Sequence, residues 1–421
     1  MNRLVYSSLW VVGIPFALAR LAWRARKQPD YLRNVAERFG TIATSARPTL
    51  WVHAVSVGET RAAQPLIKAL RARFPEHDIL LTHMTPTGRA TGAELYGKDA
   101  RIRQCYLPYD LPWLVRRFLQ RTRPVVGIVM ETEVWPNLLR AAREASIPTL
   151  LVNARLSERS ARGYGRLGQL SREAFGDFTR IGAQADADAT RLRDCGANAV
   201  CVTGNMKFDV EPPADVTSRG DTFRAWADGR PVLLAASTRE GEEDLLLAEF
   251  ARTAPADVLL VLVPRHPQRF DEVAALVERH ALTVSRRSQH GNGAISTRVW
   301  LGDSMGEMAA YYRMADVCLM GGSWLPYGSQ NLIEPCAAGV PVVLGPSTFN
   351  FADAAAKALA AGAATQCENV GAGVQAGLEL LEDTQRRMQM GQAGARFAAE
   401  HRGATARTLA LIESTLTGAR G

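Results

Sequence analysis

Short apolar segments rich in β-branched residues alternate along most of the chain with longer segments in which apolar residues recur every three or four positions. The short segments predict buried strands, and the longer ones predict amphipathic helices. Strands that alternate with helices form parallel sheets, because each helix returns the chain to the start of the next strand. In the first half we expect strands over residues 49–56, 78–84, 125–132, 147–153 and 199–204, and helices over 59–73, 86–96, 134–145 and 157–175.

The alternation breaks once, at residues 208–221 (FDVEPPADVTSRGD), where two adjacent prolines and the loss of an apolar period predict a linker. A length of 421 residues also exceeds what a single core usually supports. We therefore predict an α/β protein with two doubly wound domains that face a cleft, and ligands at the carboxyl ends of the strands. Certain transferases, epimerases and two-domain binding proteins share this architecture, which alone does not distinguish them. After the break we expect strands over 231–237, 257–264, 297–302, 316–322 and 340–345, and a helical tail over 384–417.

The N-terminus carries an uncharged apolar run over residues 4–19, which residues 21–23 extend and a basic cluster follows at Arg24, Arg26 and Lys27. A cleaved signal peptide would carry its positive charges before the run, so we predict an uncleaved membrane anchor over residues 1–27. The positive flank places the rest of the chain in the cytoplasm. The run is short for a spanning helix of about 20 residues, so a spanning helix, an interfacial helix and a buried helix of a soluble domain all stay open.

Charge is distributed unevenly around a net value of +8. Residues 1–215 hold 31 basic and 20 acidic side chains, whereas residues 216–421 hold 19 and 22. A basic half suits phosphorylated lipid or a bilayer surface, although a solvated arginine-rich surface would look the same. We expect no nucleic-acid partner, because no nucleic-acid-binding signature is present. The six cysteines are scattered without a CxxC pair, which predicts reduced thiols rather than a zinc site or disulfide framework.

Three polar segments follow predicted strands of the first half: HAVSVGET (53–60), METEVWPN (130–137) and TGNMKFD (203–209). Glu59 falls at a strand-to-helix turn, where a carboxylate can take a proton from a hydroxyl group. We expect the positive end of the helix to keep Glu59 ionised at neutral pH. Glu131 closes an apolar strand, and Lys207 can hold a carboxylate or stabilise a departing phosphate. Helix capping or simple surface exposure is the alternative for each residue.

Similar segments end the strands of the second half, at AASTREGEE (235–243), VPRHPQRF (263–270), GDSMGEM (302–308) and GGSWLPYGSQNLIEP (321–335). Arg265 suits a phosphate, because its planar guanidinium donates two parallel hydrogen bonds. Ser304 to Glu307 fall at a predicted helix N-terminus, which favours an anion. Glu334 can accept hydrogen bonds from both hydroxyls of a ribose. Each residue taken alone also fits a capping or turn role.

These segments, in this order and spacing, resemble the 3-deoxy-D-manno-octulosonic acid (Kdo) transferase family of bacterial inner-membrane enzymes. The resemblance covers essentially the whole chain and includes MTPTGRA (84–90), YLPYDLP (106–112), NARLSERS (153–160) and GPSTFNF (345–351). It implies two Rossmann-like domains of the GT-B type, with an acceptor-binding domain over 28–210, a linker over 211–221 and a donor domain with C-terminal helices over 222–421. It also implies inverting transfer of Kdo from CMP-Kdo to a lipid A precursor (lipid IVA), without a metal or another cofactor.

By the same resemblance, Glu59 is the general base, and Glu131 and Lys207 stabilise the transition state. One departure is visible: where the family has Gly-Gly-His-Asn, this chain has Gly328-Ser329-Gln330-Asn331. A transferase of the same fold with another nucleotide sugar and lipid, and a non-catalytic membrane-anchored binding protein, stay open as alternatives. The residues that the resemblance assigns to CMP are Pro264, Arg265, Met305, Gly306, Glu307, Asn331, Leu332, Ile333 and Glu334.

Overall fold

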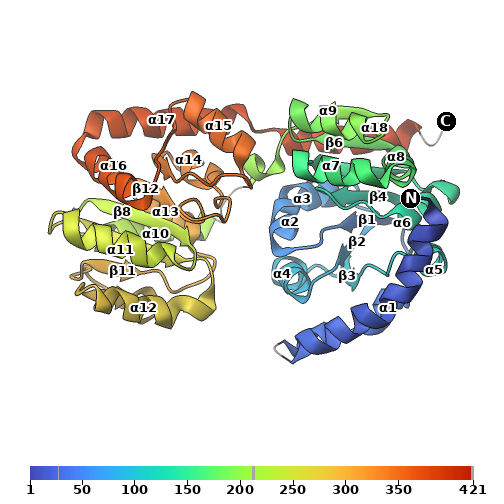
Figure 1. Ribbon diagram of the computed structural model, residues 1–421, viewed down its shortest axis with the longest axis horizontal. Coiled ribbons are helices and arrows are strands. Elements are labelled where there is room, and N and C mark those ends of the chain that lie inside the picture. Colours follow the sequence, from blue (N-terminus) through green and yellow to red (C-terminus); the bar gives the residue numbers. More distant parts are fainter. Residues whose placement is uncertain (27, 211–213, 419–421) are drawn as a thin grey trace. The chain divides into compact units, whose positions relative to one another are not determined.

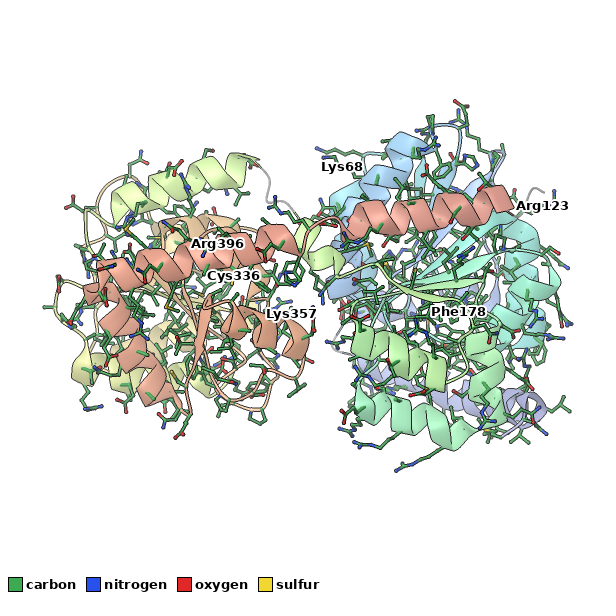
Figure 2. The ribbon with its side chains drawn as sticks, turned by 90° about the horizontal axis from the view of Figure 1, so that it is seen from above. Lys68, Arg123, Phe178, Cys336, Lys357 and Arg396 are labelled. Atoms are coloured by element: carbon green, nitrogen blue, oxygen red, sulfur yellow. The ribbon has the colours of Figure 1, made fainter. Side chains whose placement is uncertain are left out.

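The computed structural model describes residues 1–26, 28–210 and 214–418 and separates the chain into two compact units (Figure 1). The first unit comprises Met1–Val210 together with Arg402–Gly421, and the second comprises Glu211–His401. Each unit contains a seven-stranded sheet covered by helices, which confirms the predicted α/β class and its two doubly wound sheets. In Figure 2 the labelled Phe178 and Cys336 lie inside the first and second unit respectively, and both are buried.

The first sheet is parallel throughout and has the order β3-β2-β1-β4-β5-β6-β7. The direction of strand addition reverses between β1 and β4, and ligands of doubly wound sheets bind outside the carboxyl ends of the strands at such a reversal. The strands are β1 (Thr49–His53), β2 (Asp78–His83), β3 (Ile102–Tyr106), β4 (Pro124–Met130), β5 (Thr149–Ala154), β6 (Arg180–Ala183) and β7 (Val200–Val202).

Helices cover both faces of this sheet and form two apolar clusters with it. Several begin at a proline or a side-chain cap. In α4, for example, Thr85 accepts a hydrogen bond from the N–H of Gly88, and Pro86 occupies the first turn. The helices of the first unit are α1 (Arg3–Ala25), α2 (Val57–Ala62), α3 (Gln64–Arg73), α4 (Pro86–Tyr96), α5 (Pro112–Thr122), α6 (Pro136–Glu144), α7 (Glu158–Leu167), α8 (Gln169–Gly176), α9 (Asp186–Asp194) and α18 (Ala404–Gly418).

The second sheet is also parallel, with the order β10-β11-β9-β8-β12-β13-β14 and a reversal between β8 and β12. Its strands are β8 (Val232–Thr238), β9 (Leu259–Pro264), β10 (Val284–Arg286), β11 (Val299–Leu301), β12 (Val317–Met320), β13 (Val342–Leu344) and β14 (Ala364–Gln366). Its helices are α10 (Ala214–Trp226), α11 (Glu242–Thr253), α12 (Phe270–Arg279), α13 (Met308–Met314), α14 (Ile333–Ala337), α15 (Ala352–Ala360), α16 (Val370–Glu382) and α17 (Thr384–Glu400).

Each of the ten expected strands is present, and four further strands, β3, β6, β10 and β14, were not predicted. The edge strands β3, β10 and β14 contain polar residues that are only partly buried, so they lack the apolar runs of central strands. The predicted linker over 211–221 is wrong from Ala214 onward, where α10 begins. Residues 211–213 lie outside the described part of the chain.

The tail is helical as predicted, but it does not lie wholly in the second domain. It forms two helices, α17 and α18, and α18 packs in the first unit. The carboxylate of Asp209 accepts the N–H groups of Gly403 (2.7 Å) and Thr405 (2.6 Å), which caps the start of α18. The guanidinium of Arg407 donates to the carbonyl of Thr203 at 2.8 Å. These partners lie almost 200 residues apart in the sequence, so no local pattern indicates their contact.

Ile412 on α18 is fully buried in the apolar cluster formed with β1, β4 and β5. We expect Ile412→Ala to lower the free energy of unfolding of the first unit by about 2–4 kcal/mol, because the missing side chain leaves a cavity. Hydrogen exchange measured by mass spectrometry should accelerate in β1 and β4 but not in β8 and β12. The exposed Leu245 serves as the control, since Leu245→Ala should change stability by no more than about 0.5 kcal/mol. Faster exchange confined to the second unit would contradict the assignment of α18.

Candidate active site

Glu59 lies in the first turn of α2, directly after the carboxyl end of β1. It forms a capping box with Ser56: the N–H groups of Val55 and Ser56 donate to Oε2 of Glu59 at 2.5 and 2.9 Å, and the N–H of Glu59 donates to the Ser56 hydroxyl at 3.4 Å. Both backbone donors reach the same carboxylate oxygen, so Oε1 stays outside the capping box. The residue is 8% exposed. Glu59 therefore caps helix α2 through Oε2, and its Oε1 takes no part in the cap.

Burial and neighbouring negative charge control the protonation of Glu59. Burial, with the carboxylates of Glu131 and Glu133, raises its pKa to about 7, against the hydrogen bonds from Ser56 and Val55. The expectation that helix α2 keeps Glu59 ionised at neutral pH is therefore wrong. The N-terminus of a six-residue helix does not compensate for desolvation beside two carboxylates. A carboxyl group that titrates near pH 7 can both accept and release a proton there.

Glu131 follows β4, the strand next to β1. Its φ of +57° places it in the left-handed region, which is costly for a residue other than glycine and is common at functional sites. Its N–H donates to the carbonyl of Val152 at 3.0 Å, and its Oε1 lies 3.5 Å from Nζ of Lys207. Lys207 is the third residue that we predicted for this site. The structure therefore brings its ammonium group to the carboxylate that also raises the pKa of Glu59.

Two further titratable residues at this edge were not assigned a role from the sequence. The pKa of Glu133 is raised by burial, although the indole N–H of Trp135 donates to its carboxylate at 3.0 Å. Nε2 of His53 lies 4.0 Å from the same carboxylate, and burial lowers the pKa of His53 to about 3, so the imidazole is neutral. That Nε2 is buried and has no hydrogen-bond partner among the described residues. The second carboxylate of METE was the available signal for Glu133.

The segment that carries Lys207 is held from two sides. Asn153, at the end of β5 with a φ of +51°, accepts the N–H of Met206 at 3.0 Å, and Asn205 accepts the N–H of Lys207 at 3.0 Å. On the other side, Asp209 caps α18. Asn153 belongs to the NARLSERS motif, but nothing in its local sequence links it to Lys207. The position of the lysine thus depends on β5 and on the returning C-terminal helix.

In the second unit, Pro264 is the buried last residue of β9, and the partly exposed Arg265 follows it. The N–H of Arg265 donates to the carbonyl of Thr238 at 2.9 Å, which ties it to the end of β8. Arg269, from the same motif, is buried and forms an ion pair with Glu243 at 2.7 Å. The two arginines therefore differ: Arg269 is part of the buried framework, and Arg265 lies at the carboxyl edge of the sheet.

Residues 305–307 follow β11 at the same edge of the sheet. Met305 is exposed, Gly306 has a φ of +79°, and Glu307 is buried. The Glu307 carboxylate pairs with Arg219 at 2.7 Å and Arg287 at 3.0 Å. Burial acts to raise its pKa, but these arginines and the Ser304 hydroxyl hold the pKa of Glu307 below its usual value. The Glu307 carboxylate is therefore used by contacts within the unit. A ligand at this turn would contact the backbone instead.

The glycine-rich loop after β12 is organised by Glu242, which we did not single out from the sequence. This buried carboxylate accepts the N–H groups of Gly322 (2.7 Å), Trp324 (3.0 Å) and Leu325 (3.3 Å). Burial nevertheless raises the pKa of Glu242. Ser329, at the position where the family has glycine, adopts a φ of +70°. A serine in this region costs of the order of 1 kcal/mol relative to glycine.

At the end of this loop, Asn331 and Glu334 form a hydrogen-bonded pair, with Nδ2 of Asn331 2.8 Å from Oε1 of Glu334. Both side chains are partly exposed. The intervening Leu332 and Ile333 are buried in the apolar core, so their side chains support the loop and do not present groups to a ligand. The nine residues predicted to bind the donor thus collect at the carboxyl edge of one sheet, with Asn331 and Glu334 as the polar pair among them.

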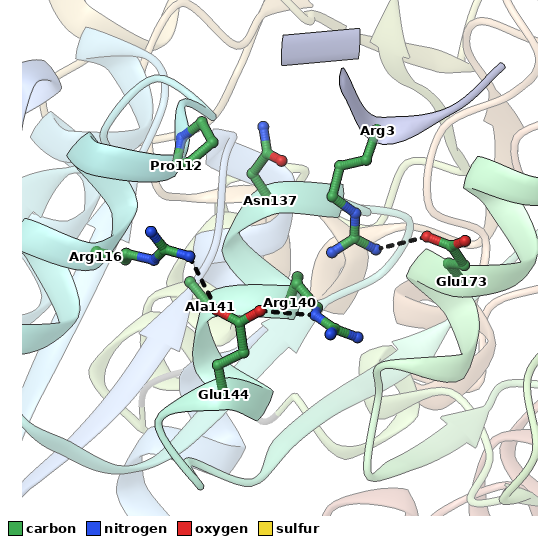
Figure 3. A pocket seen from close by; sticks show the side chains of 8 residues that line it. All are labelled: Arg3, Pro112, Arg116, Asn137, Arg140, Ala141, Glu144 and Glu173. Carbon is green, nitrogen blue, oxygen red and sulfur yellow. Dashed lines mark hydrogen bonds and ion pairs between the residues drawn. The ribbon is translucent and has the colours of Figure 1, made fainter. Parts of the chain in front are cut away.

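Two cavities lie near these edges. One of about 490 Å³ lies among α1, α5, α6 and α8, where Arg3 faces Glu173, and Arg116 and Arg140 face Glu144 (Figure 3). The other, of about 530 Å³, adjoins the glycine-rich loop and is lined by Trp324, Leu325, Pro326, Pro346, Ser347, Thr348 and Phe349. Within the described residues, no group of three or more His, Cys, Asp or Glu side chains is placed to hold a metal ion.

The family and the two relatives that this chain matches carry the same description. The family described as 3-deoxy-D-manno-octulosonic-acid transferase (kdotransferase) matches residues 33–210. A 3-deoxy-D-manno-octulosonic acid transferase of Bordetella pertussis is 48% identical, and the match covers 95% of this chain and 97% of that protein. A protein of the same name from Haemophilus influenzae is 34% identical, with 99% of both chains covered.

Solved structures share the fold at low sequence identity. A glycosyltransferase from Rickettsia africae matches with a TM-score of 0.59 at 13% identity, over 89% of this chain and 99% of that one. The UDP-GlcNAc 2-epimerase of Neisseria meningitidis matches with a TM-score of 0.59 at 14% identity, over 88% of this chain and 100% of that one. These likenesses support the GT-B arrangement of two Rossmann-like sheets.

The raised pKa of Glu59 has a consequence for stability. A carboxyl group whose pKa rises from 4.5 unfolded to about 7 folded stabilises the fold below pH 4.5, and this contribution is lost as pH rises through 7. Glu59→Gln cannot ionise and does not lose this contribution. Its free energy of unfolding minus that of the wild type should therefore be larger at pH 8 than at pH 5, by on the order of 2 kcal/mol. Urea unfolding at both pH values measures the difference. If the free energies of unfolding of the variant and the wild type differ by the same amount at both pH values, the raised pKa of Glu59 is contradicted.

Proposed function

This chain belongs to the 3-deoxy-D-manno-octulosonic acid (Kdo) transferase family, and from that membership we propose that it transfers Kdo from CMP-Kdo to a lipid A precursor at the cytoplasmic face of the inner membrane. It is a glycosyltransferase that acts in the synthesis of the lipopolysaccharide core. The observation that carries the proposed mechanism is the buried carboxyl group of Glu59, which has a pKa of about 7 and is coupled to Glu131 beside Lys207. This arrangement supports general-base catalysis at neutral pH.

In the proposed reaction, the ionised Glu59 takes the proton of an acceptor hydroxyl through Oε1. The hydroxyl oxygen then forms a bond to the anomeric carbon of Kdo. The bond from that carbon to the phosphate oxygen breaks, and CMP leaves with the electron pair. Attack and departure occur on opposite faces of the sugar, so the configuration inverts. The backbone donors to Oε2 hold the carboxylate in place during the proton transfer.

Lys207 and Glu131 supply opposite charges to the same step. Kdo carries a carboxylate and CMP leaves as a phosphate, so the ammonium group of Lys207 stabilises negative charge on either group. The carboxylate of Glu131 stabilises the positive charge that develops at the anomeric carbon. Their separation of 3.5 Å keeps the ammonium group beside the carboxylate at the proposed site of reaction.

The second unit supplies the donor site in this proposal. Arg265 binds the phosphate of CMP, the backbone of residues 305–307 contacts the nucleotide, and the pair of Asn331 and Glu334 binds the ribose hydroxyls. Pro264, Leu332 and Ile333 hold these groups through the buried framework. Support for this assignment comes from the common position of all these residues at the carboxyl ends of β9, β11 and β12, where doubly wound sheets bind ligands.

Mass spectrometry of the lipid product tests the proposed substrates. We expect purified protein, incubated with CMP-Kdo and a tetraacyl disaccharide bisphosphate, to yield a lipid heavier by one or more Kdo residues, with release of CMP. UDP-sugars in place of CMP-Kdo should give no product. Transfer from a different nucleotide sugar, or to a different lipid alone, would establish the alternative of a related transferase with other substrates.

Glu59→Ala tests the proposed base. We expect this variant to lose transfer by at least about 100-fold, because no other group takes the hydroxyl proton, while calorimetry shows CMP affinity within about twofold of the wild type. Glu94→Ala is the matched control, since Glu94 is an exposed glutamate of the same unit, paired with Arg61 on the surface. Retention of transfer by Glu59→Ala, or loss of CMP binding in a correctly folded variant, would exclude Glu59 as the base.

A further inference from the structure

Helix α1 exposes a long apolar face. Its inward side carries the polar side chains Arg3, Tyr6 and Ser7 and then apolar residues that pack on the first unit, and its outward side is apolar. A helix of a water-soluble protein normally turns a polar face outward. No residue of α1 is buried, and its mean hydropathy of 1.6 is that of a helix apolar enough for a membrane. The outward residues are Leu4, Val5, Leu9, Val11, Val12, Phe16 and Trp23, and Phe16 is 73% exposed.

The inward face of α1 is fastened to the first unit from its first turn. The N-terminal ammonium group donates to the carbonyl of Leu167 at 3.1 Å, and Arg3 pairs with Glu173 and Asp177, each at 3.2 Å. The Tyr6 hydroxyl donates to Asp110 at 2.9 Å. The amide of Asn137 donates to the Ser7 hydroxyl at 3.0 Å. These contacts connect α1 to loops and helices of the globular unit.

Apolar contacts continue along the helix. Trp10, Ile14 and Ala17 pack against Tyr109, Leu111 and Leu114 at the start of α5, and Figure 1 shows α1 running along the side of the first unit past α5. Contacts with the unit therefore extend from Met1 to Ala17. At a rise of about 1.5 Å per residue, this segment covers roughly 24 Å. A helix that crosses a hydrocarbon core of about 30 Å would place its N-terminal end on the far side, away from the globular unit.

We infer that α1 does not span the bilayer but lies in the plane of its interface, with its outward apolar face among the acyl chains. The inference rests on the proposed function only in taking a bilayer of anionic lipids as the partner. The polar contacts of Met1, Arg3 and Tyr6 hold the helix on the same side as the globular unit. The apolar outward face needs a covering of low polarity, which an interfacial helix finds at the boundary between head groups and acyl chains.

Helix α5 supplies a second element of the same surface. It exposes Trp113, which is 57% accessible, together with Arg117, while Leu114 and Val115 are buried and Arg116 pairs with Glu144. A tryptophan beside an arginine is typical of a membrane–water interface, where the indole reaches the head-group region and the guanidinium group meets anionic lipid. Arg116 and Arg3 line one cavity with Asn137, so this part of α5 lies next to the first turn of α1 (Figure 3).

The inward side of α1 reaches the residues around Glu133 and Glu59. Trp10 of α1 packs on Trp135, with ring centroids 6.3 Å apart, and the indole N–H of Trp135 donates to Glu133 at 3.0 Å. Glu133 in turn contributes to the raised pKa of Glu59. The interfacial helix therefore forms part of the wall behind the proposed base. An acceptor lipid could present its sugar head to this site while its acyl chains stay in the bilayer.

Thiol labelling distinguishes an in-plane helix from a spanning one. In a background of Cys201→Ser and Cys367→Ser, which removes the more accessible thiols, we place one cysteine by Asn2→Cys or by Lys68→Cys. Lys68 is exposed on the first unit and reports the side on which that unit lies. A membrane-impermeant maleimide is applied to inside-out inner-membrane vesicles and to spheroplasts. We expect both cysteines to react in the same preparation. Labelling of the two positions from opposite sides would overturn the inference.

Vesicle binding tests the surface itself. Full-length protein is sedimented with phosphatidylcholine vesicles that contain or lack phosphatidylglycerol. We expect tighter binding to the anionic vesicles, and we expect Phe16→Glu and Trp113→Ala each to weaken binding, by about tenfold for Phe16→Glu. Leu245→Ala, at an exposed leucine of the second unit, should bind as the wild type does. Unchanged binding of Trp113→Ala would remove α5 from the surface. Neither measurement involves sugar transfer, so its failure is distinguishable from failure of the proposed reaction.

Discussion

The crowding of three carboxylates beside Lys207 is the constraint on which the proposed site of the first unit depends. Glu59 is buried after β1, and Glu131 and Glu133 lie partly buried after β4, so the ionised form of Glu59 is unfavourable. The backbone N–H groups at Glu59, the indole of Trp135 and the ammonium group of Lys207 reduce this cost without removing it. What is left is a carboxyl group that titrates near pH 7, as proton transfer at neutral pH requires.

The carboxylates of the two units have different electrostatic environments. In the first unit, the backbone donors offset burial and negative charge only in part, so the pKa of Glu59 stays raised. In the second, the carboxylates of Glu242 and Glu307 are paired with backbone N–H groups or with arginines, and they fix loops. These paired carboxylates hold the loops at the carboxyl edge of the second sheet, where Arg265 and the Asn331–Glu334 pair lie. Preorganised polar groups of this kind bind a charged ligand with little rearrangement.

The sequence was most informative where structure is local. Apolar runs predicted the central strands, and strand-end motifs predicted that Glu59, Glu131 and Lys207 would share one edge. It was least informative for groups that act over long separations. Asn153 holds the Lys207 segment from 53 residues away, and Asp209 caps a helix that starts almost 200 residues later. The ionisation of Glu59 was predicted wrongly, because helix position is visible in a sequence whereas the burial of Glu59 and its proximity to two carboxylates are not.

The return of the chain from His401 into α18 makes the second unit an insertion within the first. The second unit is one continuous stretch, whereas the unit that carries Glu59 is assembled from the segments before and after it. Recombination between paralogues can therefore exchange the second unit as one segment and leave the core of the first unit intact. Replacement of the second unit on an unchanged first unit is the evolutionary route that this connectivity favours.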